Sequence, residues 1–388
     1  MKITLQVKLA PSPEQYQILL TTLETFNAAC NSISRVAWEK KVFGKFALQE
    51  IVYKDVRSTF HLSAQRTIRA MAKVSDAYKT NRKTLCPFKP HGVMIYDPRI
   101  LSFKGLSKVS LLTLSGRQVP PRGMGNYQKT RFSRGKAQAD LVPVDRVFYL
   151  LVTLDIEEEP PLNPKDFIGI DLGMVRIATD STGENFSGEQ VEKFRSRYHH
   201  LRCSLQKKGT KSAKRKLKKI ARKESRFRKE VNHVISKKLV QKAKDTPSGI
   251  GLEDLSHIRG RTTVRKSDRA RHRGFCFHQL QQFIHYKAKI AGVPVVIVNA
   301  RNSSRACSCC PHIAKCNRKS QSLFFCSNCC HTENADDNAS KVISFRADKS
   351  YGLSQSTQVD SAQSLGTASR RALALAVYDY QGGIFTFK

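Results

Sequence analysis

The chain has 388 residues, 40% of them hydrophobic, so it can bury a substantial core, and its length indicates two or three domains. Its 68 Lys and Arg residues outnumber 31 Asp and Glu, and the net charge of +37 points to a polyanionic partner, with nucleic acid as the first candidate. The longest apolar run, residues 290–298, is far too short to span a bilayer, which excludes a membrane-spanning protein.

The N-terminus and the cysteines indicate the cellular compartment. Residues 1–9 alternate polar and apolar side chains and lack the hydrophobic region and cleavage site of a signal peptide, so we expect an intracellular protein. Seven of the 11 cysteines fall between Cys307 and Cys330. Such clustering in a reducing compartment points to a bound metal rather than to disulfides.

The N-terminal part of the chain predicts a sheet with helices inserted into it. Residues 3–9 alternate as a half-buried strand does, and helical periodicity from residue 13 to about 85 then predicts a small helical bundle. Short β-rich runs between residues 93 and 156 predict a small antiparallel barrel or sheet. Because the first strand has no nearby partner, we expect it to join this later sheet. Acids and prolines at 157–164 are typical of a linker.

The rest of the chain alternates strands and helices, which predicts an α/β domain. A strand at 167–171 and two short runs that follow it predict three antiparallel strands at the beginning of this domain. Further strands are predicted at 249–253 and 293–298, with a helix at 275–291 between them.

Two segments of this half stand out by composition. Between Lys193 and Lys244, 21 residues are Lys or Arg, and apolar side chains recur at helical spacing, so we expect two basic helices. Residues 259–273 predict a basic loop. Beyond Arg346 the periodicity fades, and we expect roughly the last forty residues to be largely disordered.

Four cysteines form two C-x-x-C pairs, at 307–310 and 326–329, with a short segment between them. This spacing is typical of a tetrahedral zinc ribbon, in which each turn brings two thiolates to one ion and a hairpin joins the pairs. We therefore predict one structural zinc ion. Three further cysteines are surplus or free thiols, and one of them adjoins the fourth ligand and could replace it. The predicted ligands are Cys307, Cys310, Cys326 and Cys329, and the surplus residues are Cys309, Cys316 and Cys330.

Three acidic residues lie at the ends of predicted elements. Asp171 and Glu253 end apolar strands, and Asp336 opens a predicted helix. Taken singly, each is more often a turn or capping residue than a catalytic one. Taken together, they suit phosphodiester hydrolysis by two Mg2+ ions, because this chemistry needs carboxylates that converge from separate segments.

These motifs resemble those of TnpB proteins of bacterial insertion sequences, which are related to the type V CRISPR effectors. The motifs are Ile-Gly-Ile-Asp-Leu-Gly at 168–173, Gly-Leu-Glu-Asp-Leu at 251–255, the paired C-x-x-C ribbon and Asn-Ala-Asp-Asp-Asn-Ala at 334–339. The strong match covers about residues 165–345, whereas the N-terminal half matches mainly in layout.

The resemblance implies an α+β multidomain fold. Its parts are a RuvC-like, RNase H-type α/β nuclease domain with an inserted four-cysteine zinc ribbon, and an N-terminal wedge-like β-barrel domain with an inserted helical bundle. The expected boundaries are 1–12 and 88–160 for the barrel, 13–87 for the helical recognition domain, 165–302 and 334–346 for the nuclease, 303–333 for the ribbon and 347–388 for the tail.

The resemblance also implies chemistry and partners. Asp171, Glu253 and Asp336 would bind two Mg2+ ions, and a transposon-derived guide RNA would direct cleavage of double-stranded DNA next to a short adjacent motif. A location in the prokaryotic cytoplasm, with action at the nucleoid, follows. The oligomeric state stays open.

Two alternatives and three departures qualify this interpretation. A nuclease-silent RNA-guided repressor would use the same fold, although the intact carboxylates argue against it. A protein-only transposase is disfavoured because no Tyr or Ser nucleophile context is found. Pro311 and Cys330 stand where the family often has Gly, and Asp337 adds an acid where an aliphatic residue is usual, so Asp337 is a reserve candidate.

Overall fold

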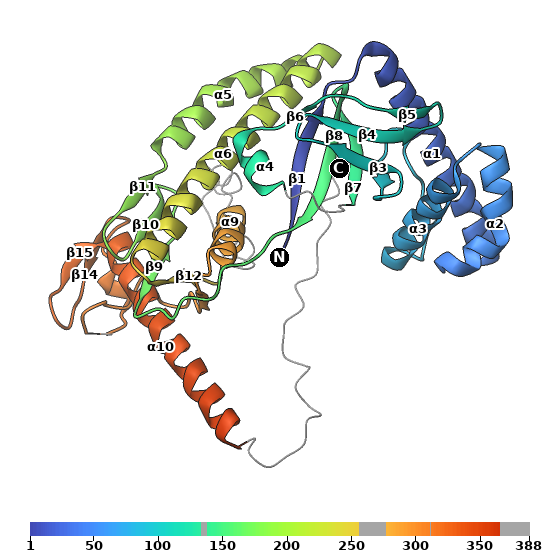
Figure 1. Ribbon diagram of the computed structural model, residues 1–388. Coiled ribbons are helices and arrows are strands. Elements are labelled where there is room, and N and C mark those ends of the chain that lie inside the picture. The colour runs from blue at the N-terminus through green and yellow to red at the C-terminus, as the bar shows by residue number, and fades with distance from the viewer. Residues whose placement is uncertain (133–137, 256–276, 311, 365–388) are drawn as a thin grey trace. The chain divides into compact units, whose positions relative to one another are not determined.

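The computed structural model describes most of the chain as two compact units. The units are Met1–Glu157 and Glu158–Lys388, and the boundary between them falls within the predicted linker (Figure 1). The described residues are 1–132, 138–255, 277–310 and 312–364, with side chains to residue 353. The predicted basic loop, Pro311 and the end of the tail lie outside them.

The first unit is built on a five-stranded antiparallel sheet in the order β2-β7-β8-β1-β6. The first strand pairs with β8 from Lys2 opposite Asp155 to Lys8 opposite Tyr149, which confirms that it joins the later sheet. The strands are β1 (Lys2–Leu9), β2 (Met94–Tyr96), β6 (Arg122–Gly123), β7 (Ala139–Val144) and β8 (Val147–Asp155).

A three-stranded sheet of β3, β4 and β5 joins the larger one through a bridge between Lys108 and Pro121. Among the described strands, β2 and β6 do not pair, so the closed barrel stays a prediction. The elements are β3 (Leu101–Lys104), β4 (Lys108–Thr113), β5 (Gly116–Gln118) and the short helix α4 (Asn126–Arg131).

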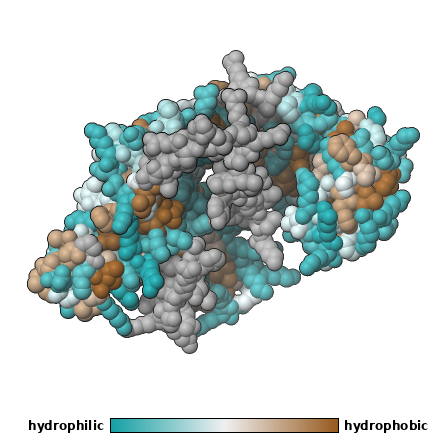
Figure 2. Space-filling model, turned by 90° about the horizontal axis from the view of Figure 1, so that it is seen from below, coloured by the Kyte–Doolittle hydropathy of each residue, from teal (hydrophilic) through white to brown (hydrophobic). Residues whose placement is uncertain are grey.

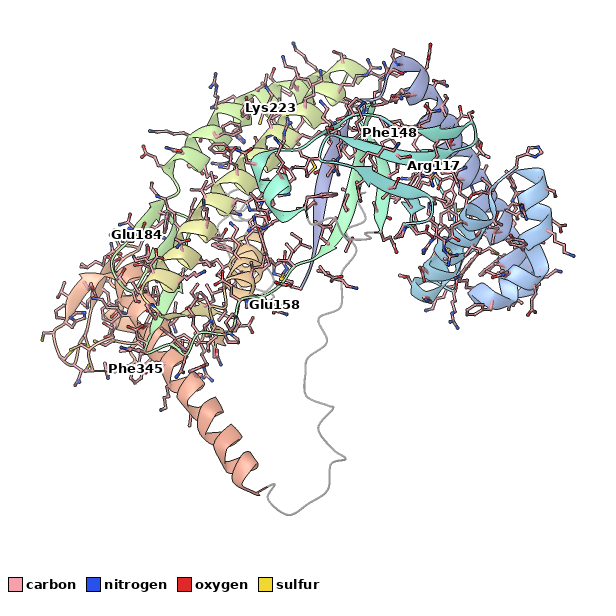
Figure 3. All side chains as sticks on the ribbon, in the orientation of Figure 1. Arg117, Phe148, Glu158, Glu184, Lys223 and Phe345 are labelled. Atoms are coloured by element: carbon pink, nitrogen blue, oxygen red, sulfur yellow. The ribbon has the colours of Figure 1, made fainter. Side chains whose placement is uncertain are left out.

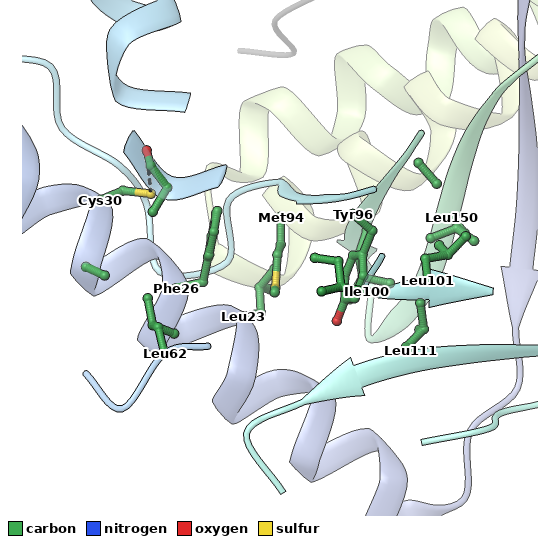
Figure 4. Close-up of a cluster of buried hydrophobic side chains, with 14 of the residues drawn as sticks. Leu23, Phe26, Cys30, Leu62, Met94, Tyr96, Ile100, Leu101, Leu111 and Leu150 are labelled. Carbon is green, nitrogen blue, oxygen red and sulfur yellow. Dashed lines mark hydrogen bonds between the residues drawn. The ribbon is translucent and has the colours of Figure 1, made fainter. Parts of the chain in front are cut away.

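Three helices are inserted between β1 and β2: α1 (Pro13–Lys40), α2 (Lys45–Thr59) and α3 (Ala64–Thr80). Ser12 and Gln15 form a capping box at the start of α1. The helices share one core with the sheets, and Figure 4 shows Leu23, Phe26 and Cys30 of α1 in line with buried strand residues such as Tyr96. The helical insertion and the sheets are therefore one packed body.

The second unit contains a five-stranded sheet in the order β11-β10-β9-β12-β13. Strand β10 is antiparallel to both of its neighbours, β9 and β11. On the other side of β9, β12 and then β13 run parallel to it. This confirms the predicted α/β organisation. The strands are β9 (Phe167–Asp171), β10 (Arg176–Asp180), β11 (Asn185–Ser187), β12 (Gly249–Glu253) and β13 (Val295–Val298).

Helices cover both faces of this sheet. Ile170 and Leu252 point to one face and pack with residues of α6 (Lys211–Asp245) and α9 (Phe277–Ile290). Since side chains alternate along a strand, Asp171 and Glu253 point to the other face. That face is covered by α10 (Ala335–Ser364).

Glycines on β9 and β12 allow α10 to approach the sheet closely. A Cβ atom on Gly169 would lie 2.1 Å from the Ser340 carbonyl oxygen, and one on Gly251 would lie 2.7 Å from the Cβ of Ala347. Each glycine precedes an acidic residue of the site by two positions in its strand. In each of the two motifs, the glycine and the acidic residue therefore lie on the face of the sheet that α10 covers.

The prediction that the tail is largely disordered from residue 347 is wrong for residues 347–364, which continue α10. Ala347 is fully buried, and the Tyr351 ring contacts Phe167 with ring centroids 5.0 Å apart. These contacts on the sheet stabilise a helix whose own sequence shows little periodicity, because packing overrides local propensity.

The basic segment forms an antiparallel hairpin of α5 (Glu189–Lys208) and α6, which lie side by side in Figure 1. A small core that includes Leu205 and Ile220 holds the hairpin, and Phe194 of α5 also stacks on Phe227 of α6 with ring centroids 4.5 Å apart. The outer faces carry lysines and arginines such as Lys223, labelled in Figure 3. Hydrophilic residues also cover much of the face seen in Figure 2, and no described helix combines the length and apolarity needed to cross a bilayer.

Candidate functional site

Three predicted site residues come together where the sheet meets α10. Ile170 of β9 pairs with Leu252 of β12, so the carboxyl ends of these parallel strands lie side by side. Asp171 and Glu253 are the last residues of the two strands, and Asp336 lies in the first turn of α10, which packs on both. Three segments that are distant in the chain thus contribute to one site.

The surroundings of all three carboxylates disfavour their charged forms, and the other two acids act on Asp171 in addition. Burial, followed by the charges of Glu253 and Asp336, raises the pKa of Asp171 to about 8. Burial also raises the pKa of Glu253 and of Asp336. One oxygen of Glu253, Oε1, is buried without a hydrogen-bond partner in the described part of the chain. Like charges and an unsatisfied carboxylate oxygen fit a site for a divalent cation, which would relieve both.

Arg318 is a further residue of this site, and sequence reasoning assigned it no role. Its Nη2 atom lies 3.7 Å from Asp336 Oδ1. Its positive charge opposes the rise in the pKa of all three acids, so it is close to the whole cluster. The residue lies within residues 165–345, over which the family resemblance extends, and between the two C-x-x-C pairs, and this was the available signal.

The two adjacent acids at the start of α10 have different surroundings. The charge of Asp336 acts on Asp171. Asp337 instead accepts hydrogen bonds at both carboxylate oxygens from Arg176 Nη1 on β10, each at 3.2 Å. The geometry therefore favours Asp336 over the reserve candidate as the third member of the cluster.

The four predicted zinc ligands form a second cluster. Their sulfur atoms all lie within 4.8 Å of one another, with Cys307 and Cys329 3.7 Å apart and Cys310 and Cys326 3.5 Å apart. This group could hold a zinc ion. Cys309, Cys316 and Cys330 are exposed and do not belong to it.

Local hydrogen bonds give the cysteines of the cluster unlike pKa values. The backbone N–H of His312 and the Asn328 side chain lower the pKa of Cys310 to about 6, which favours its thiolate form. The backbone N–H of His331 acts in the same direction on Cys329, but hydrogen bonds with the neighbouring thiols raise the pKa of Cys329 to about 12. The buried side chain of Asn317 donates to the carbonyl of His312 and accepts from the backbone N–H of Ser327, so it joins the two C-x-x-C turns. Cys330 has φ of 57°, a left-handed conformation that explains why glycine suits this position.

The ribbon is joined directly to α10. Its hairpin consists of β14 (Leu323–Phe325) and β15 (Thr332–Asn334), and a short 3-10 turn (Lys315–Asn317) precedes it. Asn338 of α10 accepts a hydrogen bond from Ser308 N at 3.0 Å and donates to the carbonyl of Ala306 at 2.8 Å. The first C-x-x-C turn and the helix that carries Asp336 are therefore joined by hydrogen bonds.

Comparisons with protein families cover both clusters. A model described as a probable transposase, OrfB_IS605, matches residues 150–257, which include Asp171 and Glu253. A model described as a Cas12f1-like TNB domain matches residues 277–343, which include the four cysteines and Asp336.

Individual proteins resemble the chain over parts of its length. The CRISPR-associated endodeoxyribonuclease Cas12f1 of Sulfoacidibacillus thermotolerans is 28% identical over 278 residues, which cover 65% of this chain and 64% of that protein. The TnpB-like protein MJ0751 of Methanocaldococcus jannaschii is 38% identical over 98 residues, 25% of this chain and 34% of that protein. The match thus spans less than two thirds of either relative.

A solved structure, the cryo-EM structure of the Cas12f1-sgRNA-target DNA complex, aligns with 89% of this chain and 99% of its own chain, at 17% identity and a TM-score of 0.38. The family models and the sequence relatives confirm the resemblance that the motifs carry. The chain is thus similar to TnpB and Cas12f proteins over the residues that these comparisons match.

Proposed function

We propose that this protein is an RNA-guided DNA endonuclease that hydrolyses double-stranded DNA next to a short adjacent motif in a single RuvC-like site. The observation that carries the proposal is the convergence of Asp171, Glu253 and Asp336 on one face of the sheet. The relative named an endodeoxyribonuclease supports the substrate class. Guidance by RNA follows from the resemblance to TnpB proteins.

The chemistry is assigned to the cluster residues as follows. Asp171, Glu253 and Asp336 would hold two Mg2+ ions, which supply an activated water and charge stabilisation for phosphodiester hydrolysis. Arg318 stands beside Asp336 with its guanidinium 3.7 Å away and would bind a phosphate oxygen of the DNA. The missing Cβ atoms of Gly169 and Gly251 allow α10 to lie close to the sheet, which would bring Asp336 toward the two strand-end acids.

Nucleic acid binding is assigned to basic surface rather than to base-reading side chains. The α5–α6 hairpin carries most of the 21 basic residues of its segment on its outer faces, which suits contact with phosphates. A guide RNA would select the DNA by base pairing, and the protein would hold the heteroduplex by its shape and backbone. The zinc ribbon would keep Arg318 and Asp336 in place.

The test is to purify the full chain under nuclease-free conditions, sequence the RNA that accompanies it, and incubate the complex with a matching DNA duplex and Mg2+. We expect one discrete RNA species and cleavage at a fixed position. The matched control is Asp171→Asn, which removes a charge without changing size and should abolish cleavage while RNA binding persists.

Each outcome bears on the proposal. Guided cleavage that is lost in Asp171→Asn supports it. Binding of the duplex without cleavage by the wild type contradicts it in favour of a nuclease-silent repressor. Absence of any specific RNA contradicts RNA guidance itself.

A further inference from the structure

An ion pair lies directly beside the carboxylate cluster. Arg176 is on β10, and one of its terminal nitrogens donates to both oxygens of Asp337 at 3.2 Å. The two side chains are partly exposed, at 28% and 24%. Asp337 follows Asp336 in the first turn of α10, so the pair lies next to a residue of the site.

Arg176 is a potential competitor for Asp336. Its charge acts on the Asp336 carboxylate as well as on its own partner. The guanidinium of arginine stays charged and has five N–H donors, so a partly buried arginine is stabilised by pairing with a carboxylate. If Arg176 paired with Asp336, it would occupy oxygens that a divalent cation needs. Arg318 already lies 3.7 Å from the same carboxylate, so a second arginine would place two positive charges beside one negative charge and disfavour a cation there.

We propose that Asp337 is a positioning residue that holds Arg176 away from Asp336 and thereby keeps Asp336 free to bind a divalent cation. The inference rests on the proposed function, because it concerns the metal affinity of the same site. The proposal gives a role to Asp337, which stands at a position where the resembling family usually has an aliphatic residue.

The competing role is simple attachment of β10 to α10. If the pair only attaches β10 to α10, loss of either partner breaks the same contact. Asp337→Asn and Arg176→Gln should then weaken cation binding equally, and the double variant should bind no more tightly than either single variant. Under the proposal, the two single variants differ. Asp337→Asn releases Arg176 toward Asp336, whereas Arg176→Gln removes the competitor. The double variant Arg176→Gln/Asp337→Asn then regains the affinity that Asp337→Asn loses.

The experiment measures Mn2+ binding to the full chain, with its accompanying RNA, by electron paramagnetic resonance. We expect Asp337→Asn to weaken Mn2+ binding at the carboxylate site by roughly fivefold or more. Arg176→Gln should bind as tightly as wild type or more tightly, and the double variant should return to within about twofold of wild type. Asp336→Asn identifies which bound Mn2+ belongs to the site.

A matched control is Asp97→Asn in the first unit. It breaks another partly buried pair of an arginine and an aspartate, with Arg69 Nε at 2.7 Å and side-chain exposures of 28% and 2%, and should leave Mn2+ binding at the carboxylate site unchanged. Unchanged binding in Asp337→Asn, failure of the double variant to recover, or absence of Mn2+ binding by wild type would each overturn the inference. Mn2+ binding with this pattern but without DNA cleavage would overturn the proposed function alone.

Discussion

The two candidate metal sites of this protein are held together in opposite ways. The four cysteines all lie between positions 307 and 329, and their hairpin has a core of only a few buried side chains. The three carboxylates come from distant segments and sit on a sheet that is packed by helices on both faces. We therefore expect the ribbon to need a bound ion in order to fold, and the carboxylate site to fold on its own core and to be destabilised by its own charges.

Because of this contrast, we expect substitutions at the two clusters to have different effects. Replacing a cysteine of the zinc cluster should unfold the ribbon. Replacing one of the three carboxylates should abolish DNA cleavage and leave the fold equally stable or more stable.

The largest effect is expected from Glu253→Gln. The change keeps the size of a buried side chain but removes a metal-binding charge, so guided cleavage should fall by roughly 1,000-fold or more. The unfolding midpoint in magnesium-free buffer should stay equal or rise, because the pKa of Glu253 is raised by burial and ionisation there is unfavourable. A clear drop in stability would show that the carboxylate is structural and break the contrast.

Cys326→Ser should have the next largest effect. Cys326 is fully buried in the ribbon core, and its loss should reduce bound zinc from about one per chain to nearly none. Proteolysis should then cut between residues 303 and 333 while the sheet of the second unit persists. Elemental analysis gives the zinc content, and Cys316→Ser, which changes an exposed surplus thiol, serves as the control. Equal zinc loss in both variants would contradict the ligand assignment.

Arg318→Ala tests whether a residue of the ribbon contributes to the carboxylate site. Because its guanidinium is beside Asp336 but the residue belongs to the ribbon, cleavage should fall by about 100-fold while zinc content stays normal. Its neighbour Lys319 lies over the Phe325 ring, so Lys319→Ala is a matched loss of positive charge directed elsewhere. Comparable loss of cleavage in both variants would reduce the role of Arg318 to general basic charge.

The smallest effect is a pH dependence of stability. Asp171 ionises near its ordinary pKa of 3.8 in the unfolded chain and near about 8 in the folded one. Between these values the folded protein keeps a proton that the unfolded chain has lost, so the free energy of unfolding should fall as pH rises, by at most about 1.4 kcal/mol per pH unit from this group. Urea denaturation of wild type and Asp171→Asn in magnesium-free buffer measures it. Identical slopes would argue against a raised pKa.

Sequence reasoning succeeded where the signal was local. The C-x-x-C spacing predicted the four cysteines that the structure brings together. The motifs around Asp171 and Glu253 predicted strands that end in these acids, and alternation along the strands puts both on one face. The pairing of β1 with β8 followed from a strand that lacked a nearby partner.

It failed where distant residues determine the outcome. The pair of Arg176 and Asp337 joins residues 161 positions apart, and no local pattern announces it. Arg318 acquires its place only because the ribbon folds back on α10. The continuation of α10 beyond residue 346 depends on contacts of Ala347 and Tyr351 with the sheet, which a weakly periodic sequence does not reveal.

The position of α10 late in the chain has a consequence for synthesis on the ribosome. A nascent chain that has released β9 and β12 already exposes Asp171 and Glu253, but the face that α10 covers is still open, and Asp336 has not emerged. Domains fold as their residues leave the ribosome, so the carboxylate cluster can be completed only after the ribbon and the first turns of α10 have followed. An unfinished chain is therefore unable to assemble the three-carboxylate cluster, and a product of interrupted translation lacks it.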